Sequence, residues 1–312
     1  MVTILSVIPW SLFWSCVLAA SALAGGGQHY PNGAEGFLCG IAPTPGAYMV
    51  NYTAWYNASR FNFDDGEEKD ELDFHVNVLV DAPRFLFFPG YRILGGDYGF
   101  YFALPVYYAD LKTSYSGLDM GSDHASGLAD IVFSPLILGY HSQDQKKHLI
   151  LGFDLYAPNG HYDPRHPATS IMARNHWTFE PNVAFSWIFL HGIDLSAKFL
   201  FDFHTENDDY SDIFGRRGTL RPGKEFHLDY ALGIPLSEKL RIGLNGFYYQ
   251  QIEDDEFNGQ GIGDERGFTW ALGPAFKYSS NHWALIFKHQ VEISSRNRPL
   301  GSFSWMKLQL KF

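Results

Sequence analysis

Hydrophobic and polar positions alternate along most of this chain. Phe74, Val76 and Val78, for example, alternate with His75 and Asn77. A period of two residues is that of a strand whose two faces meet different surroundings. The pattern predicts twelve strands, at residues 48–57, 72–81, 98–112, 128–141, 147–157, 175–189, 193–204, 226–234, 240–251, 268–278, 283–293 and 303–312.

The predicted strands are long for a soluble sheet, in which the average strand has about 5 or 6 residues. A strand tilted by about 45° needs roughly 9 to 11 residues to cross the hydrocarbon of a bilayer. Because an open sheet edge in lipid leaves backbone groups unpaired, such a sheet must close on itself. We therefore expect an all-β fold, a transmembrane antiparallel up-and-down β-barrel of about 12 strands that spans residues 47–312.

The connections between the predicted strands alternate in length, as expected for short periplasmic turns and long outer loops. The connection at 83–97 is the exception, because it falls on the periplasmic side but is long and rich in Phe, Pro and Gly. It either tucks into the barrel mouth or extends the neighbouring strands. The short connections are 142–146, 191–192, 235–239 and 279–282, and the long polar ones are 61–71, 113–127, 158–174, 205–225 and 252–267.

The N-terminus has a different pattern. Residues 1–24 carry no charge and form an apolar segment that ends in Ala22-Leu23-Ala24, a small-x-small cleavage pattern. An uncleaved anchor helix is the alternative, disfavoured by Pro9 and by the glycines at 25–27. We expect a signal peptide at residues 1–24, followed by an N-terminal periplasmic or plug segment at 25–46.

Composition narrows the environment of the protein. Aromatic residues make up 17% of the chain, with 18 Tyr, 27 Phe and 8 Trp, which fits aromatic girdles at two membrane interfaces. The formal net charge of −11 argues against a nucleic-acid partner, since neutralising phosphates needs a basic surface. The expected location is the outer membrane of a Gram-negative bacterium.

The last predicted strand ends on an aromatic residue. Met306, Leu308, Leu310 and Phe312 share one face of this strand. A terminal Phe on an amphipathic strand resembles the assembly signal of outer-membrane barrels, although a plain edge strand gives the same alternation. Phe312 is therefore the candidate signal for the barrel-assembly machinery.

Six stretches carry a resemblance to a known family: HYPNGAEG (29–36), DAPRFLFFPGYRILGGDYGF (81–100), GLADIVFSPLILGYH (127–141), LYAPNGHYDP (155–164), RPGKEFHLDYALG (221–233) and NRPLGSFSWMKLQLKF (297–312). They resemble the outer-membrane protein family named for the meta-pathway of phenol degradation. The resemblance covers nearly all of the chain after the expected signal peptide. It implies an outer-membrane barrel, in a family whose members are often assigned to the passage of small hydrophobic, commonly aromatic, molecules.

Charged and polar side chains on the face assigned inward are the candidate lumen residues. In this assignment Val76 and Phe185 meet lipid, whereas His75 and Glu180 face the interior. The candidates either line a polar channel or form a hydrogen-bonded network that only stabilises the barrel. They are Asp73, His75, Asp81, Glu180, Asp202, His204, Arg241, Lys288 and Glu292.

The leading functional hypothesis is an outer-membrane channel for passive uptake of small hydrophobic or aromatic compounds, without catalytic residues, metal or cofactor. The alternative is a structural or adhesive barrel, whose acidic outer loops at 64–71 and 253–256 could bind cations that bridge lipopolysaccharide. An outer-membrane lipid hydrolase is a weaker alternative, because His124 and Ser126 have the spacing to share a strand face, although 117–127 is expected to be a loop. The expected partners are the bilayer, lipopolysaccharide, the assembly machinery and a small hydrophobic solute.

Overall fold

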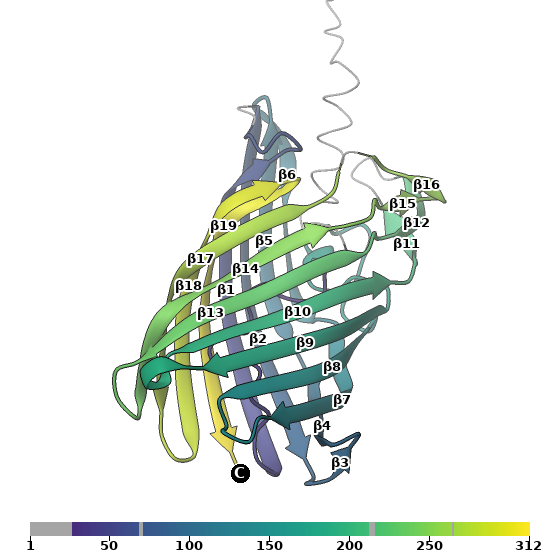
Figure 1. Cartoon of the computed structure of the whole chain (residues 1–312). Helices are drawn as coiled ribbons and strands as arrows, with labels where there is room; N and C mark the ends of the chain where they lie inside the picture. The colour runs from purple at the N-terminus through teal and green to yellow at the C-terminus, as the bar shows by residue number, and fades with distance from the viewer. Residues whose placement is uncertain (1–26, 69–70, 212–215, 264) are drawn as a thin grey trace, which may run out of the picture.

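The computed structural model of the chain describes residues 27–68, 71–211, 216–263 and 265–312 (Figure 1). The expected signal peptide at residues 1–24 lies outside the described residues. Within the described part of the chain, no helix is long and apolar enough to cross a membrane.

The strands form one closed antiparallel barrel. The first strand, β1 (Gly46–Asn62), pairs with the last, β19 (Arg298–Lys311), which closes the sheet. The prediction of a transmembrane barrel of about twelve strands is confirmed. With β4 and β5 counted as one interrupted strand, and β6 and β7 as another, the barrel strands in the described residues are β1, β2 (Leu72–Phe88), β4 (Gly96–Ala103) with β5 (Val106–Tyr115), β6 (Leu118–Leu128) with β7 (Ile131–His141), β8 (Lys147–Ala157), β9 (Thr178–Ile188), β10 (Asp194–His204), β13 (Glu225–Pro235), β14 (Leu240–Gln251), β17 (Phe268–Ser279), β18 (Trp283–Arg296) and β19.

Two neighbouring strands are interrupted side by side. Leu104 and Pro105 separate β4 from β5, and Ala129 and Asp130 separate β6 from β7. Pro105 has no N–H to donate to a ladder, so regular pairing stops there. The long strand β2 bridges the interruption, because its first part pairs with β5 and its last part pairs with β4.

Two connections bear on the sequence prediction. Residues 113–127 were expected to form an outer loop, but they form most of the β5–β6 hairpin, which turns at Ser116 and Gly117. The outward side chains of β6 include His124 and Ser126, so this strand lacks the apolar positions that would have indicated it. The connection at 83–97 extends the neighbouring strands, since β2 runs on to Phe88 and the short β3 (Arg92–Ile93) pairs with the start of β4.

The two ends of the barrel differ. One end, here called the short-turn end, carries the C-terminus, the brief connections and the 3-10 turn η3 (Leu190–Gly192). The opposite, long-loop end carries the β5–β6 hairpin, the loop with η2 (Thr169–Ile171) and a separate small sheet (Figure 1). That sheet consists of β11 (Asn207–Ser211), β12 (Arg217–Arg221), β15 (Glu256–Phe257) and β16 (Gln260–Gly261).

The outer wall is apolar over much of its circumference. Val183, Phe199, Leu232, Ile242 and Phe287 come from five different strands, and each is exposed on the outside of the barrel. Their sequence neighbours point inward and are mostly buried. A band of exposed apolar side chains around polar inward positions is the arrangement of a wall that meets lipid.

Candidate functional site

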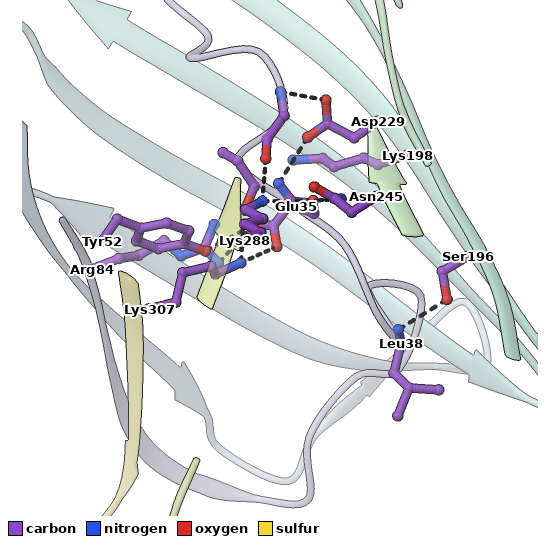
Figure 2. A network of polar contacts seen from close by, with 12 residues as sticks. Glu35, Leu38, Tyr52, Arg84, Ser196, Lys198, Asp229, Asn245, Lys288 and Lys307 are labelled. Carbon is purple, nitrogen blue, oxygen red and sulfur yellow. Dashed lines mark hydrogen bonds and ion pairs between the residues drawn. The ribbon is translucent and has the colours of Figure 1, made fainter. Parts of the chain in front are cut away.

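Residues 27–45, here called the inner segment, run through the barrel interior. The wall holds this segment mainly by its backbone (Figure 2). Gly33 and Glu35 donate their N–H groups to Asp229 of β13 at 2.7 and 2.8 Å, and Leu38 donates to Ser196 of β10 at 2.9 Å. Such bonds fix the path of the segment largely independently of its side chains.

Two glycines allow the inner segment to approach the wall closely. Gly33 has a φ of 77°, and a Cβ there would lie 2.3 Å from the side-chain oxygen of Gln290. A Cβ at Gly40 would lie 2.5 Å from the backbone of Phe185 and Ser186. Because backbone cannot move aside as a flexible side chain can, Gly40 is required for the contact with β9.

The inner segment places one carboxylate at the centre of the barrel. Glu35 accepts hydrogen bonds from Tyr52 at 2.9 Å, from Arg84 at 3.0 Å and from Lys307 at 2.8 Å. Lys288 donates to the main-chain oxygens of the same stretch, including that of Glu35 at 2.9 Å. This group of five residues, the Glu35 centre, pairs an inner-segment charge with cations from three different strands (Figure 2).

The wall around the inner segment has two chemically different sides. The polar wall is formed by the buried inward residues of β9, β10 and β13, and the apolar wall by those of β1, β2 and β5. In the polar wall these are Thr178, Glu180, Asn182, Ala184, Ser186, Asp194, Ser196, Lys198, Leu200, Asp202, Glu225, His227, Asp229, Ala231 and Gly233. In the apolar wall they include Val50, Tyr52, Ala54, Ala58, Phe74, Val76, Val78, Tyr107, Ala109 and Leu111.

Two cavities lie within the barrel. The outer cavity, of about 200 Å³, lies between the inner segment and a lining that is largely apolar and aromatic. The inner cavity, of about 460 Å³, extends toward the short-turn end. Both are lined by Glu35, Arg84, Tyr101 and Lys198, so the Glu35 centre lies between them. The apolar and aromatic residues of the outer cavity include Tyr52, Ala54, Tyr56, Val78, Val80, Ala82, Ala103, Val132, Phe303 and Trp305.

Six of the nine candidate lumen residues point inward. Arg241 pairs with Asp194, and Lys288 belongs to the Glu35 centre. Glu292 accepts a hydrogen bond from Tyr56 at 3.0 Å. The remaining three, Glu180, Asp202 and His204, lie on the inward faces of β9 and β10 near the long-loop end.

The other three candidates lie on the outer face, which corrects the sequence assignment. Asp73 and His75 are exposed and contact each other at 3.1 Å, and Asp81 accepts hydrogen bonds from outward-facing Asn51 and Thr53. Val76, assigned to lipid, is buried in the apolar wall. The reason is that the interior beside β2 is packed with other parts of the chain, so its apolar side chains point inward as in a soluble core.

The most important interior charges were not among the sequence candidates. Glu35 lies in the stretch HYPNGAEG, and Arg84 lies in the unusual 83–97 connection. Lys307 lies between Met306 and Leu308 in the last strand, on the face opposite these apolar residues. A charge at the inward parity of that strand was the one available signal, since nothing local indicates that Glu35 meets Arg84.

The pKa values of His176 and Asp255, near the long-loop end, are shifted by burial. Burial holds the pKa of His176 well below its ordinary value, and the neighbouring imidazole of His29 acts in the same direction. Burial raises the pKa of Asp255 to about 6, although hydrogen bonds from Gly223 and Gln251 favour its charged form. His176 is therefore neutral at pH 7, and Asp255 changes charge close to that pH.

The residues considered for a lipid hydrolase are on the outer face of β6. His124 and Ser126 are both exposed, and no hydrogen bond joins them. Asp110 of β5 lies opposite His124 in the ladder. This arrangement lacks the nucleophile–base contact on which such catalysis depends.

A closed barrel with an apolar outer wall defines an outer-membrane β-barrel protein of a Gram-negative bacterium, embedded in the lipid bilayer. The family model described as "Putative MetA-pathway of phenol degradation" matches residues 58–308, and the chain belongs to this family.

Solved structures with the same fold are known. The chain is similar to the COG4313 outer membrane channel from Pseudomonas putida F1, with a TM-score of 0.69 and 15% identity over 88% of this chain and 98% of that one. It is also similar to the translocator domain of the autotransporter NalP from Neisseria meningitidis, with a TM-score of 0.51 and 8% identity over 86% of this chain and 90% of that one. No curated protein matches the chain in sequence.

Proposed function

We propose that this protein is a passive outer-membrane channel for small hydrophobic compounds, in particular monocyclic aromatic ones. The observation that carries the proposal is the outer cavity, which lies between the inner segment and a largely apolar lining. A dry apolar cavity of about 150 Å³ is large enough to bind benzene. A volume of about 200 Å³ therefore suits one aromatic ring with small substituents.

The Glu35 centre provides the gate in this proposal. A solute that leaves the outer cavity meets Glu35 and Arg84 before it reaches the inner cavity. Passage then requires the inner segment or these side chains to move. We propose that Glu180, Asp202, His204, Arg241, Lys288 and Glu292 keep the interior ordered, while the apolar lining provides the path.

The family description and the channel from Pseudomonas putida F1 favour the same class of function. The alternative of a structural or adhesive barrel predicts no solute flux at all. Uptake of a labelled monocyclic aromatic compound by intact cells that express the protein therefore distinguishes the two.

The sharpest variant fills the outer cavity. Ala103 is 7% exposed and lines this cavity, so Ala103→Trp should reduce uptake to that of cells without the barrel. Val291→Trp, on the outer face of β18, is the matched control and should leave uptake unchanged. If wild-type protein that is folded in the membrane gives no uptake above empty cells, the channel proposal is wrong and the structural alternative is favoured.

We also propose the remaining partners and the processing of the chain. Residues 1–24 are removed as a signal peptide, which the mass of the mature protein tests. The exposed Phe312 side chain favours recognition by the assembly machinery, so deletion of Phe312 should lower the amount of folded barrel in the membrane. Acidic loops at the long-loop end suit cations bridging lipopolysaccharide, whose removal by a chelator should then increase loop proteolysis.

A further inference from the structure

Four ionisable side chains form a compact group on two neighbouring strands of the polar wall. Asp202 and His204 are two residues apart on β10, and Glu225 and His227 are two residues apart on β13. Asp202 lies directly opposite Glu225 in the ladder, so all four side chains share one inward face. Each side chain is fully buried.

The facing atoms are close, but they are not hydrogen-bonded to one another. His204 Nε2 lies 3.4 Å from Glu225 Oε2, while His227 Nε2 lies 3.3 Å from Asp202 Oδ2 and 3.6 Å from Glu225 Oε2. All of these atoms, together with Asp202 Oδ1, lack a hydrogen-bond partner. Burying charged atoms that meet only as ion pairs, without aligned hydrogen bonds, is costly, so such a concentration in one place needs an explanation.

The other nitrogen of each imidazole is already engaged. His227 Nδ1 lies 2.6 Å from Asn32 Oδ1, and an amide oxygen can only accept, so this nitrogen carries the proton. A neutral His227 ring therefore presents the lone pair of Nε2 to the carboxylates. A second bond to the ring nitrogen that is not a ligand is also how metal-binding histidines are oriented.

The same reasoning applies to His204 through a chain of hydrogen bonds. His29 Nε2 donates to Asp130 at 2.8 Å, so a neutral His29 accepts at Nδ1 from the Thr178 hydroxyl at 2.7 Å. Thr178 Oγ1 then accepts from His204 Nδ1 at 2.7 Å. The His204 Nε2 lone pair consequently faces Glu225.

We propose that Asp202, His204, Glu225 and His227 bind one divalent transition-metal ion, with Zn²⁺ as the best fit. Bonds of about 2.0–2.2 Å in a tetrahedron place neighbouring ligand atoms about 3.4 Å apart. Three of the six separations among the four ligand atoms, 3.3, 3.4 and 3.6 Å, match that value, and ligand atoms of Asp202, His204 and Glu225 all lie within 4.8 Å of one another. Two imidazoles and two carboxylates suit zinc, whereas calcium and magnesium prefer all-oxygen sites.

The proposed ion has a structural role that is independent of solute transport. It joins β10 to β13 and, through Asn32 on His227, it also fixes the inner segment. None of its four ligands lines either described cavity, so the ion enters while the strands assemble. The competing explanation is a metal-free set of ion pairs between protonated histidines and the two carboxylates.

Cobalt provides a direct test, because four-coordinate Co²⁺ has strong visible absorption. Wild-type protein refolded with Co²⁺ and then freed of excess metal should retain about one ion per chain, with the spectrum of a tetrahedral nitrogen–oxygen site. The double variant His204→Gln with His227→Gln should lose this ion and its spectrum. The matched control is His141→Gln with His148→Gln, a cross-strand histidine pair at the short-turn end, and it should retain both.

Folded wild-type protein without bound cobalt would establish the metal-free ion pairs and overturn the proposal. Cobalt that persists in the folded double variant would place the site elsewhere and overturn it as well. If the double variant does not fold, X-ray absorption of the wild-type cobalt protein decides, because two imidazoles per ion support the proposal, whereas fewer, or the three of the neighbouring group His29, His176 and His204, contradict it.

Discussion

The polar wall and the apolar wall of the barrel interior differ in their side chains and in the contacts that they make with the inner segment. The polar wall of β9, β10 and β13 holds the inner segment by its backbone, through acceptors such as Asp229 and Ser196. The apolar wall of β1, β2 and β5 contributes few such bonds to the segment, and its strands β1 and β2 supply apolar residues to the lining of the outer cavity. The inner segment is therefore held by acceptors of the polar wall and by Lys288 and Lys307 of β18 and β19, and the proposed path for a solute runs beside β1 and β2.

The comparison also shows where the alternation of a membrane strand can be misread. In β9, polar residues point inward and apolar ones meet lipid, as for a barrel with a wet interior. In β2 the same reading is reversed, because Phe74 and Val76 pack against other parts of the chain inside the barrel. The phase of a strand depends on what fills the barrel beside it.

The largest expected effect tests this reversal at Val76. The Val76 side chain is 2% exposed inside the apolar wall, so Val76→Arg forces an unpaired charge and a larger side chain into a packed core. We expect a loss of at least roughly 4 kcal/mol in the free energy of unfolding, enough to prevent folding. His75→Arg, one residue earlier and exposed, is the control and should change stability by less than about 0.5 kcal/mol. Heat-modifiability on gels measures the folding of both variants. Equal folding would contradict the placement of Val76 inside the barrel.

The next effect concerns the lipid-facing side of the opposite wall. Val183 lies at the middle of β9 and is exposed outward. Val183→Arg should lower stability in bilayers by roughly 2–4 kcal/mol, because a charge is placed in the hydrocarbon. Phe185→Arg, closer to the short-turn end, should cost less. Urea unfolding in lipid vesicles measures the stability of both variants. A larger loss of stability for Phe185→Arg would mean that Phe185, rather than Val183, lies nearer the middle of the bilayer.

The fold was predictable because strand length and alternation repeat along the chain, so local errors did not change its class. The interior was less predictable, since Glu35 and Lys307 are 272 residues apart and meet only when the barrel closes. The β6 strand was missed for a local reason. Several of its outward side chains, such as that of Ser126, are polar, so the strand does not show the alternation of apolar and polar residues that marks the others. In each case the missing information concerned the neighbours of a residue.

A smaller effect is expected when the central charge is removed. Glu35→Gln keeps one acceptor oxygen but leaves Arg84 and Lys307 without their counter-charge in a mostly buried place, which should cost roughly 1–3 kcal/mol. The inner segment should open more often, visible as larger current fluctuations in planar bilayers. Glu253→Gln, which breaks an exposed pair with Lys224, is the control and should leave the current unchanged. Identical currents in the two variants would show that the Glu35 centre does not control opening of the channel.

The smallest effect is a pH dependence at the long-loop end. Burial raises the pKa of Asp255 to about 6 in the folded protein, above the value of about 4 for an unfolded chain. The folded state therefore binds this proton more tightly, and its stabilising effect is present at low pH and is lost as pH rises through about 6. Amide exchange near β15 should be slower at pH 5 than at pH 7.5 after correction for intrinsic rates. Asp255→Asn should abolish the difference, and an unchanged difference would assign it to another group.

Backbone anchoring makes the inner segment a replaceable part. Asp229 and Ser196 bind N–H groups that almost any residue possesses, so the wall does not specify most side chains that the segment presents to the cavities. An engineer could graft a different sequence between Gly33 and Gly40, keep the two glycines and Glu35, and obtain a barrel with altered selectivity. Because the wall binds the backbone of the segment, natural substitutions in its side chains can also change the selectivity of the channel while the twelve strands stay the same.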